Sequence, residues 1–131
     1  MQDYLLLFHG GDAVFSGLSP EEMQGVMMRW SAWMKSLRDK GIHKGGEPLE
    51  AGGAVVSPDG TVTDGPFAET KEAIAGFVMI SAKSLQEAID LSQDCPIKLT
   101  GGSIEVRPVM DIELPSLDGE GTINPCAETE K

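Results

Sequence analysis

Residues 64–72 read Asp64-Gly65-Pro66-Phe67-Ala68-Glu69-Thr70-Lys71-Glu72 and lie in mid-chain, between a hairpin-like segment and the most apolar predicted strand. Turn-forming residues, one aromatic ring and four ionisable side chains are concentrated in these nine positions. Asp and Gly favour a tight turn, while Pro66 fixes its own φ angle and pushes Gly65 toward an extended conformation. A backbone restrained in this way can hold side chains in a defined geometry. This segment is therefore the first candidate for a functional site.

Strands are predicted on both sides of this segment. Before it, the turn Ser57-Pro58-Asp59-Gly60 separates residues 53–57 from the β-branched run 61–63, which predicts a hairpin. After it, residues 73–82 are apolar with little alternation, which is typical of a central strand that is covered on both faces. Residues 42–50 also contain strand-like pieces, which glycines interrupt.

The N-terminal part predicts a strand followed by a long helix. Residues 3–9 contain an unbroken apolar run, so we expect a second central strand that is covered on both faces. The helix begins at Ser19, which can cap it, and Glu22 stands at the third position of a capping box. Gly41 is a natural end for this helix. Gly25 inside it costs about 1 kcal/mol relative to Ala, and close packing is the reason that we expect for its presence.

The C-terminal part predicts a shorter helix, a strand and a tail. Ser84 can cap the helix in the same way as Ser19 caps the first one. Residues 103–109 alternate between apolar and polar, which predicts a strand with one polar face, and Pro108 suits the edge of a sheet or the end of a strand. Residues 112–131 contain scattered acids, Gly and Pro, so we expect a flexible acidic tail after a domain of residues 1–111, although Ile112, Leu114 and Leu117 could dock its first part.

This order of elements predicts an α+β fold of the ferredoxin-like type. In this split βαβ arrangement (β-α-β-β-α-β), an antiparallel sheet carries both helices on one face. Two helices can cover only that face, whereas the two predicted central strands are apolar on both faces. A second sheet would cover the other face, and a symmetric homodimer is the simplest way to supply it. The sequence therefore predicts a dimeric α/β barrel.

Five blocks that follow one another in order give the chain a family resemblance. The segment 64–72 resembles the signature of the DGPF group within the YCII-related proteins, and the other blocks stand in the order that this family shows. They are Tyr4–Phe8, Ser19–Met23 (SPEEM), Gly45–Leu49 (GGEPL), and Cys95-Pro96 with Gly101–Val109. The resemblance covers residues 1–111 and implies a small dimeric α/β-barrel protein of a family whose activity is mostly unassigned. Some YCII relatives resemble lyases and dehydrochlorinases that use a His–Asp pair, and relatives occur beside extracytoplasmic-function sigma factors.

The composition limits the classes of function. The 131 residues form one domain, and the net charge of −11 argues against a nucleic-acid-binding surface. No apolar run approaches the roughly 20 residues of a membrane span, and no secretory signal is evident, so we expect a cytoplasmic protein without a membrane partner. Cys95, Cys126 and two separated histidines lack the spacing of a metal site, and the cysteines are expected to be reduced thiols. No glycine-rich nucleotide motif occurs, so no cofactor is expected.

His9 and Asp64 are the candidate catalytic residues. His9 follows an apolar strand and is either a strand-end histidine or the acid or base of a pocket. Asp64 either holds the turn by accepting from a backbone N–H or is a site carboxylate. Together they are the nearest substitute in this chain for the His–Asp pair that the resemblance implies. His43 is a weaker candidate because it follows the long helix, among Lys and Gly residues.

The candidate substrate-binding residues are mostly charged. Phe67 is expected in a pocket wall or in the core. Glu69 and Lys71 either form a solvated surface or supply a carboxylate and a cation for an anionic substrate. Glu47 lies among glycines that permit the close approach of a ligand or of another strand, or it is a hairpin residue with an exposed carboxylate. Arg107 either binds an acid or pairs with residues near it on the same strand.

Two functions fit these residues. The first is a small-molecule binder or enzyme whose pocket lies between the sheet and the helices, near segment 64–72, with a possible anionic ligand and cofactor-free acid–base chemistry of the lyase or isomerase type. Trp30 and Trp33 are expected in the core, although they could also form an aromatic wall for a planar ligand. The second is a non-enzymatic module that binds a metabolite or a protein partner in regulation.

Overall fold

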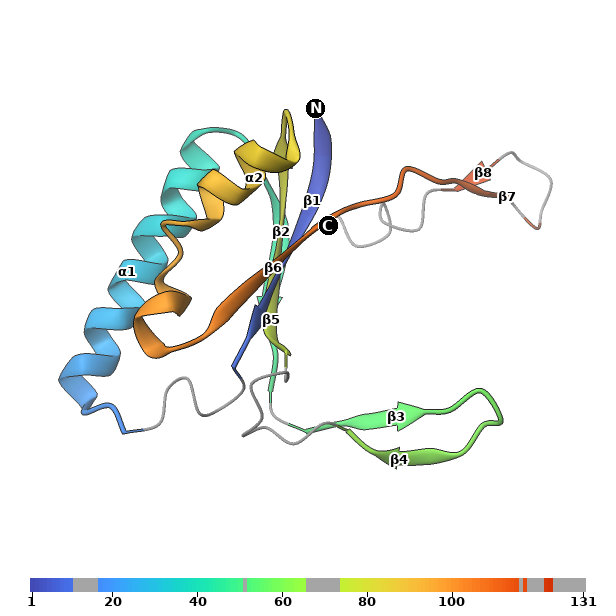
Figure 1. Cartoon of the computed structure of the whole chain (residues 1–131), viewed down its shortest axis with the longest axis horizontal. Helices are drawn as coiled ribbons and strands as arrows, with labels where there is room; N and C mark the ends of the chain where they lie inside the picture. The colour runs from blue at the N-terminus through green and yellow to red at the C-terminus, as the bar shows by residue number, and fades with distance from the viewer. Residues whose placement is uncertain (11–16, 51, 66–73, 116, 118–121, 124–131) are drawn as a thin grey trace.

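The computed structural model of the protein describes residues 1–10, 17–50, 52–65, 74–115, 117 and 122–123. These residues form an α+β fold in which a four-stranded antiparallel sheet carries two α-helices on one face (Figure 1). The arrangement is consistent with the ferredoxin-like fold, so the predicted fold class is confirmed at this level.

The sheet has the strand order β2-β5-β1-β6, and all neighbouring strands run antiparallel. The two strands that the sequence predicted as central, β1 (Gln2–His9) and β5 (Ile74–Ala82), lie in the middle. The edges are β2 (His43–Pro48) and β6 (Ser103–Pro108). Both edge strands end in a proline, which has no N–H to donate to a ladder. The expectation that Pro108 marks a sheet edge is therefore confirmed.

Both α-helices begin where their caps were predicted. At the start of α1 (Pro20–Asp39), the Ser19 hydroxyl accepts from the Glu22 backbone N–H at 3.1 Å, and the Glu22 carboxylate accepts from the Ser19 N–H at 3.0 Å. At the start of α2 (Leu85–Ser92), the Ser84 hydroxyl accepts from the Glu87 N–H at 3.1 Å. The Glu87 carboxylate accepts from the N–H of Lys83 instead of the cap residue. A short 3₁₀ helix, η2 (Pro96–Thr100), follows α2.

Gly25 is not explained by close packing. The residue is exposed in the middle of α1, and a Cβ atom added to it would meet nothing within 4 Å in the described structure. The expectation of a tight contact at this position was therefore wrong, because α1 turns Gly25 away from the sheet.

The two faces of the sheet differ in burial. In β1, the side chains of Tyr4, Leu6 and Phe8 are buried, whereas Leu5 and Leu7 are only half-buried. β5 alternates in the same way. The buried side chains form the core under the helices, together with Trp33 and other apolar residues. The described residues thus bury one face of the sheet, and they leave the face opposite the helices, here called the open face, only half-buried at Leu5 and Leu7. The described residues alone therefore do not provide the expected cover on both faces.

Within the described part of the chain, the core under the helices contains eleven buried hydrophobic residues: Tyr4, Leu6, Phe8, Trp33, Leu37, Val78, Ile80, Ala82, Ala88, Cys95 and Ile97.

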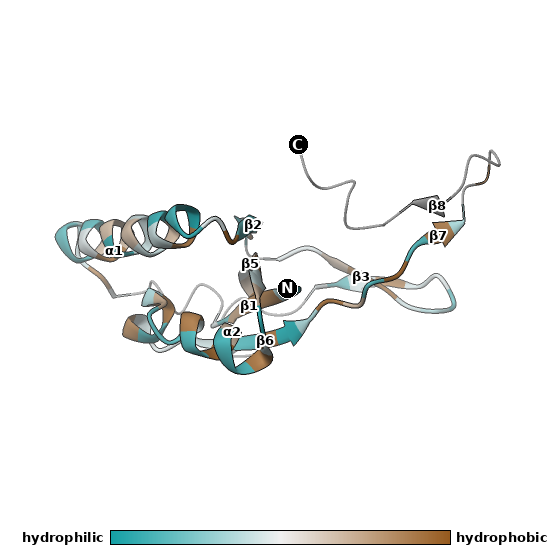
Figure 2. Ribbon diagram, turned by 90° about the horizontal axis from the view of Figure 1, so that it is seen from above, coloured by the Kyte–Doolittle hydropathy of each residue, from teal (hydrophilic) through white to brown (hydrophobic). Residues whose placement is uncertain are grey.

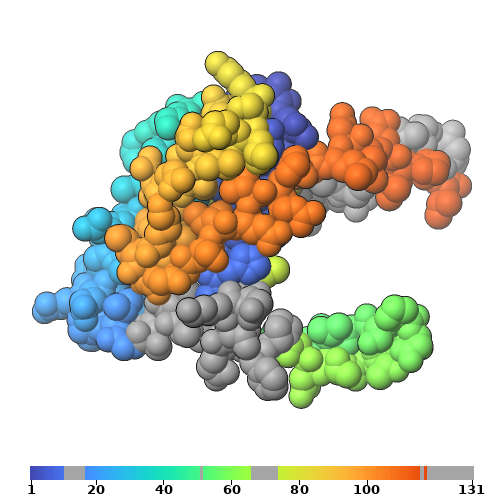
Figure 3. Space-filling model, viewed as in Figure 1, coloured from blue at the N-terminus to red at the C-terminus, as the bar shows by residue number. Residues whose placement is uncertain are grey.

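Two short hairpins project on the side of the open face. The predicted hairpin forms from β3 (Ala54–Val56) and β4 (Val62–Asp64), but it makes a separate two-stranded sheet and does not join the main one. The pair β7 (Leu114–Pro115) and β8 (Thr122–Ile123) was not predicted and lies in the acidic C-terminal segment. From above, both helices lie on one side of the sheet and both hairpins on the other (Figure 2). The space-filling view shows the hairpins standing out from the body (Figure 3).

Candidate functional site

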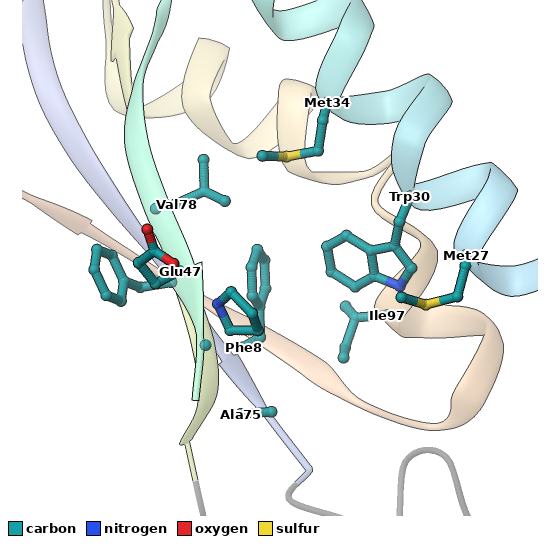
Figure 4. A pocket seen from close by; sticks show the side chains of 12 residues that line it. Phe8, Met27, Trp30, Met34, Glu47, Ala75, Val78 and Ile97 are labelled. Carbon is teal, nitrogen blue, oxygen red and sulfur yellow. The ribbon is translucent and has the colours of Figure 1, made fainter. Parts of the chain in front are cut away.

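A pocket of about 230 Å³ lies between α1 and one end of the sheet (Figure 4). On the helix side its wall is formed by Met27, Trp30 and Met34, which follow helical spacing along α1. Phe8 of β1 and residues of β2 and β5 form the opposite wall. The complete described lining is Phe8, Met27, Trp30, Met34, Gly46, Glu47, Pro48, Ala75, Gly76, Phe77, Val78 and Ile97.

Aromatic rings fix the shape of this wall. The rings of Phe8 and Trp30 meet edge to face, with centroids 5.1 Å apart and planes at 77°. Trp30 and Trp33 meet in the same manner at 5.8 Å and 81°. Such edge-to-face contacts favour one orientation of each ring beyond the gain from burial. The prediction that Trp33 belongs to the core is confirmed, whereas the half-buried Trp30 reaches the pocket.

Two glycines bring the edge strand close to β5 beside the pocket. A Cβ atom on Gly46 would lie 2.4 Å from the backbone oxygen of Phe77, and one on Gly76 would lie 2.9 Å from that of Glu47. Neither distance is sterically possible without a shift of the backbone. Gly46 of the GGEPL block therefore serves the close approach of another strand, which was one of the alternatives that the sequence left open.

The pocket lies next in the chain to the signature segment. Ala75 and Gly76 line the pocket, and they follow closely after the interval 66–73, which contains most of the signature segment. Phe67, Glu69 and Lys71 fall in this interval and lie outside the described residues, so their predicted roles stay predictions.

Asp64 and Gly65 form the base of the β3–β4 hairpin. Asp64 is exposed and pairs with Ala54 across the ladder. The N–H of Gly65 donates to the carbonyl of Gly53 at 2.9 Å, and a Cβ on Gly65 would lie 3.0 Å from the Gly53 carbonyl carbon. This close approach explains why a glycine occupies position 65. Asp64 does not belong to the described lining of the pocket.

His9 contacts Glu105 rather than Asp64 among the described residues. Its Nε2 atom lies 2.9 Å from Glu105 Oε1, and Arg107 donates to the other carboxylate oxygen of Glu105 at 3.0 Å. The hydrogen bond from Arg107, and then the one with His9, lower the pKa of the Glu105 carboxyl below its usual value. The expected alternative that Arg107 pairs along its own strand is therefore observed, and the structure makes no ion pair between His9 and Asp64.

The pocket and the charged cluster lie on opposite faces of the sheet. Phe8 and His9 are neighbours in β1, and successive strand residues point to opposite faces. Phe8 lines the pocket, so His9, Glu105 and Arg107 lie on the open face, where Leu7 is the ladder partner of Glu105. The cluster was not recognised from the sequence. The alternation of residues 103–109 indicated one polar face, but the pairing with β1 that brings it to His9 is a property of the fold.

Glu47 lies at the edge of the pocket. It is exposed, and its ladder partner is Phe77, which belongs to the open face together with Leu7. Ladder partners point to the same face of a sheet, so the carboxylate of Glu47 is directed away from the helices. The interior of the pocket is therefore formed by uncharged groups in the described structure.

His43, the weaker histidine candidate, begins β2 and is not part of the pocket lining. Burial lowers the pKa of its imidazole, and the nearby Arg38 guanidinium lowers it further. No group of three or more His, Cys, Asp and Glu side chains gathers in the described residues as a metal site would need. In the same part of the chain, no helix has the length and hydrophobicity that crossing a membrane requires.

Comparisons with known proteins identify relatives of this chain. The sequence model of the YCII-related domain matches residues 3–113. An uncharacterized protein of Rhizobium meliloti (strain 1021), R00369, is 37% identical over 114 residues, which are 81% of this chain and 90% of the relative. The match includes all the strands of the main sheet and both α-helices.

Proposed function

This chain belongs to the family of YCII-related domains, and on that premise we propose that it binds a small apolar molecule in the pocket between α1 and the sheet. The observation that carries the proposal is the pocket itself, with its volume of about 230 Å³ and its wall of aromatic rings and methionines. An apolar cavity of about 150 Å³ is enough to hold benzene. This pocket therefore has room for a substituted ring.

The charges that the described residues place around the pocket favour a neutral ligand over the anionic one that the sequence left open. Glu47 is the one ionisable residue of the described lining, and it carries a negative charge. Arg107, which could have bound an acid, lies on the open face with Glu105. Placing an anion in an apolar pocket without a cation costs a large part of its hydration energy. We assign no catalytic step to this pocket, so the proposal is a binding function.

A ligand screen with a filled-pocket variant tests the proposal. Small neutral aromatic compounds should raise the melting temperature of the protein in proportion to the logarithm of their concentration above Kd. Ala75 points into the pocket (Figure 4), so Ala75→Phe should fill it and abolish the shift. The matched control is Ala54→Phe, on the exposed strand β3, which should respond like the wild type. An equal response of both variants would refute a ligand site in this pocket.

The open face supports a second proposal, a homodimer. Leu5 and Leu7 of β1 pair across the ladder with Met79 and Phe77 of β5, which gives a half-buried apolar patch. Such a patch on both copies is self-complementary, as a two-fold interface requires. The sheet of a second copy would cover it and complete the dimeric barrel that the resemblance implies. Light scattering at tens of micromolar protein should report twice the mass of the chain, and a monomer would disprove the dimer.

As an alternative to ligand binding under α1, we propose that His9 acts as an acid or base on the open face. The observation that favours it is the hydrogen bond to Glu105, because a carboxylate partner fixes the orientation of an imidazole ring. Its substrate would bind on the open face, and Asp64 is kept as a candidate because its hairpin projects on that side (Figure 1). NMR spectra of the histidine rings in the presence of small hydroxy acids should show shifts at His9 and not at His43. Shifts at neither ring would end this candidate.

A further inference from the structure

The two tryptophans of the chain use their indole N–H groups differently. Trp33 donates its Nε1–H to the backbone oxygen of Leu91 at 3.2 Å. The Nε1 atom of Trp30 is also buried, but it has no hydrogen-bond partner within the described structure. Buried indole N–H groups in proteins are normally hydrogen-bonded, because leaving a donor unpaired away from water is costly. Trp30 therefore carries a donor that the described chain does not use.

The residue that carries this donor lines the pocket. Trp30 is one of the lining residues, and Figure 4 shows its indole nitrogen on the side of the ring that is nearer to Met27. The Met27 residue is 52% exposed. Methionine is unbranched and changes conformation easily, so a molecule that enters beside Met27 can displace it and reach the N–H. The edge contacts with Phe8 and Trp33 hold the Trp30 ring, and therefore the direction of its N–H, in place.

We infer that the ligand of this pocket is a small apolar compound with one hydrogen-bond acceptor, such as a ketone or ether oxygen, that accepts from Trp30 Nε1–H. The inference rests on the proposed function, since it names the class of molecule that the same pocket takes. A single polar group in an otherwise apolar pocket commonly fixes the orientation of a ligand. Trp30 would have this role here, and a pure hydrocarbon would leave its donor unpaired.

Two probe ligands of nearly the same shape distinguish the effect of the hydrogen-bond acceptor from that of the apolar part of the ligand. Acetophenone and cumene have nearly the same shape, but acetophenone has a carbonyl oxygen where cumene has a methyl group. The two indole N–H signals in the ¹H–¹⁵N NMR spectrum belong to Trp30 and Trp33, since the chain has two tryptophans. Acetophenone should move the Trp30 signal downfield, as a new hydrogen bond requires, and cumene should not. The Trp33 signal is the internal control because its N–H is already bonded to Leu91.

The variant Trp30→Phe provides a second readout. It removes the donor but keeps an aromatic ring, so the loss of affinity for cumene measures the change in packing alone. Acetophenone should lose about threefold to tenfold more affinity than cumene, which is the range of one ordinary hydrogen bond. An equal loss for both probes, with no downfield shift of Trp30 in the wild type, would overturn the inference and leave the pocket proposal standing. If neither probe binds the wild type, the pocket proposal fails and the inference fails with it.

Discussion

Cys95 shows how burial controls the chemistry of a single residue. Its side chain lies in the core, and removal from water raises the pKa of the thiol to about 12, although the Ile97 backbone N–H and the Lys98 charge act in the opposite direction. Only the thiolate reacts with disulfide reagents. In a Cys126→Ser background, we expect Cys95 to stay unmodified by a disulfide reagent at pH 8 in the folded protein. It should react promptly in guanidinium chloride. Equal rates in both conditions would show that the thiol is not buried.

Two glycines should respond in opposite directions to the same substitution. Gly25→Ala meets no atom within 4 Å and removes a poor helix former, so it should raise the free energy of unfolding by up to about 1 kcal/mol. Gly46→Ala places a Cβ atom 2.4 Å from the Phe77 oxygen, so it should lower that free energy by about 1–3 kcal/mol. Urea denaturation measures both. A neutral Gly46→Ala would contradict the close pairing of β2 with β5.

At the scale of elements, the Glu105 carboxylate links β6 to β1 through its contact with His9. Its folded-state pKa is lowered, first by Arg107 and then by His9, so its contribution to stability is present above the unfolded-state pKa and is lost as the pH falls through the folded-state value. Glu105→Gln should therefore be less stable than the wild type at neutral pH. The difference in unfolding free energy should shrink as the pH drops below 4.5, the ordinary pKa of a glutamate carboxyl. A difference that stays constant from pH 7 to strongly acidic conditions would show that the charge of Glu105 has no stabilising role.

The elements that local chemistry defines were predictable from the sequence. Ser19 and Ser84 fix the starts of both helices because each hydroxyl satisfies a backbone N–H that has no partner inside the helix. The turn around Pro58 and Asp59 identified the β3–β4 hairpin, in which the Asp59 carboxylate accepts from the Thr61 N–H at 2.9 Å. The separation of this hairpin from the main sheet was not predictable, since a turn sets the pairing of its own two strands and not their place in the fold.

The candidate site was only partly predictable, because it depends on register. The sequence singled out His9, Arg107 and Glu47, but it offered Asp64 as the partner of His9. Among the described residues the contact is with Glu105, which is 96 positions away in the chain and reaches His9 through the β1–β6 ladder. A shift of this ladder by one residue would turn Glu105 to the other face. No local pattern sets that register. The pocket likewise depends on the tertiary structure, because the distance between α1 and β5 determines its size.

For the whole molecule, the open face should control assembly. Leu7 is half-buried in the middle of the apolar patch, so Leu7→Asp places a charge where we expect the second copy. This variant should sediment as a monomer while keeping its circular dichroism spectrum. The control is Met28→Asp on α1, which is 65% exposed on the helix side and should leave the dimer intact. If Leu7→Asp sediments like the wild type, the second copy does not bind to this face.

NMR spectra of protein labelled on the methionine methyl groups test most directly whether the two faces of the sheet serve different partners. Met27 and Met34 line the pocket, whereas Met79 lies on the open face as the ladder partner of Leu5. Acetophenone should shift the methyl signals of Met27 and Met34 and leave Met79 unchanged. Dilution below the dimer dissociation constant should shift Met79 and leave the other two unchanged. A ligand that moves Met79, but neither Met27 nor Met34, would contradict a binding site under α1.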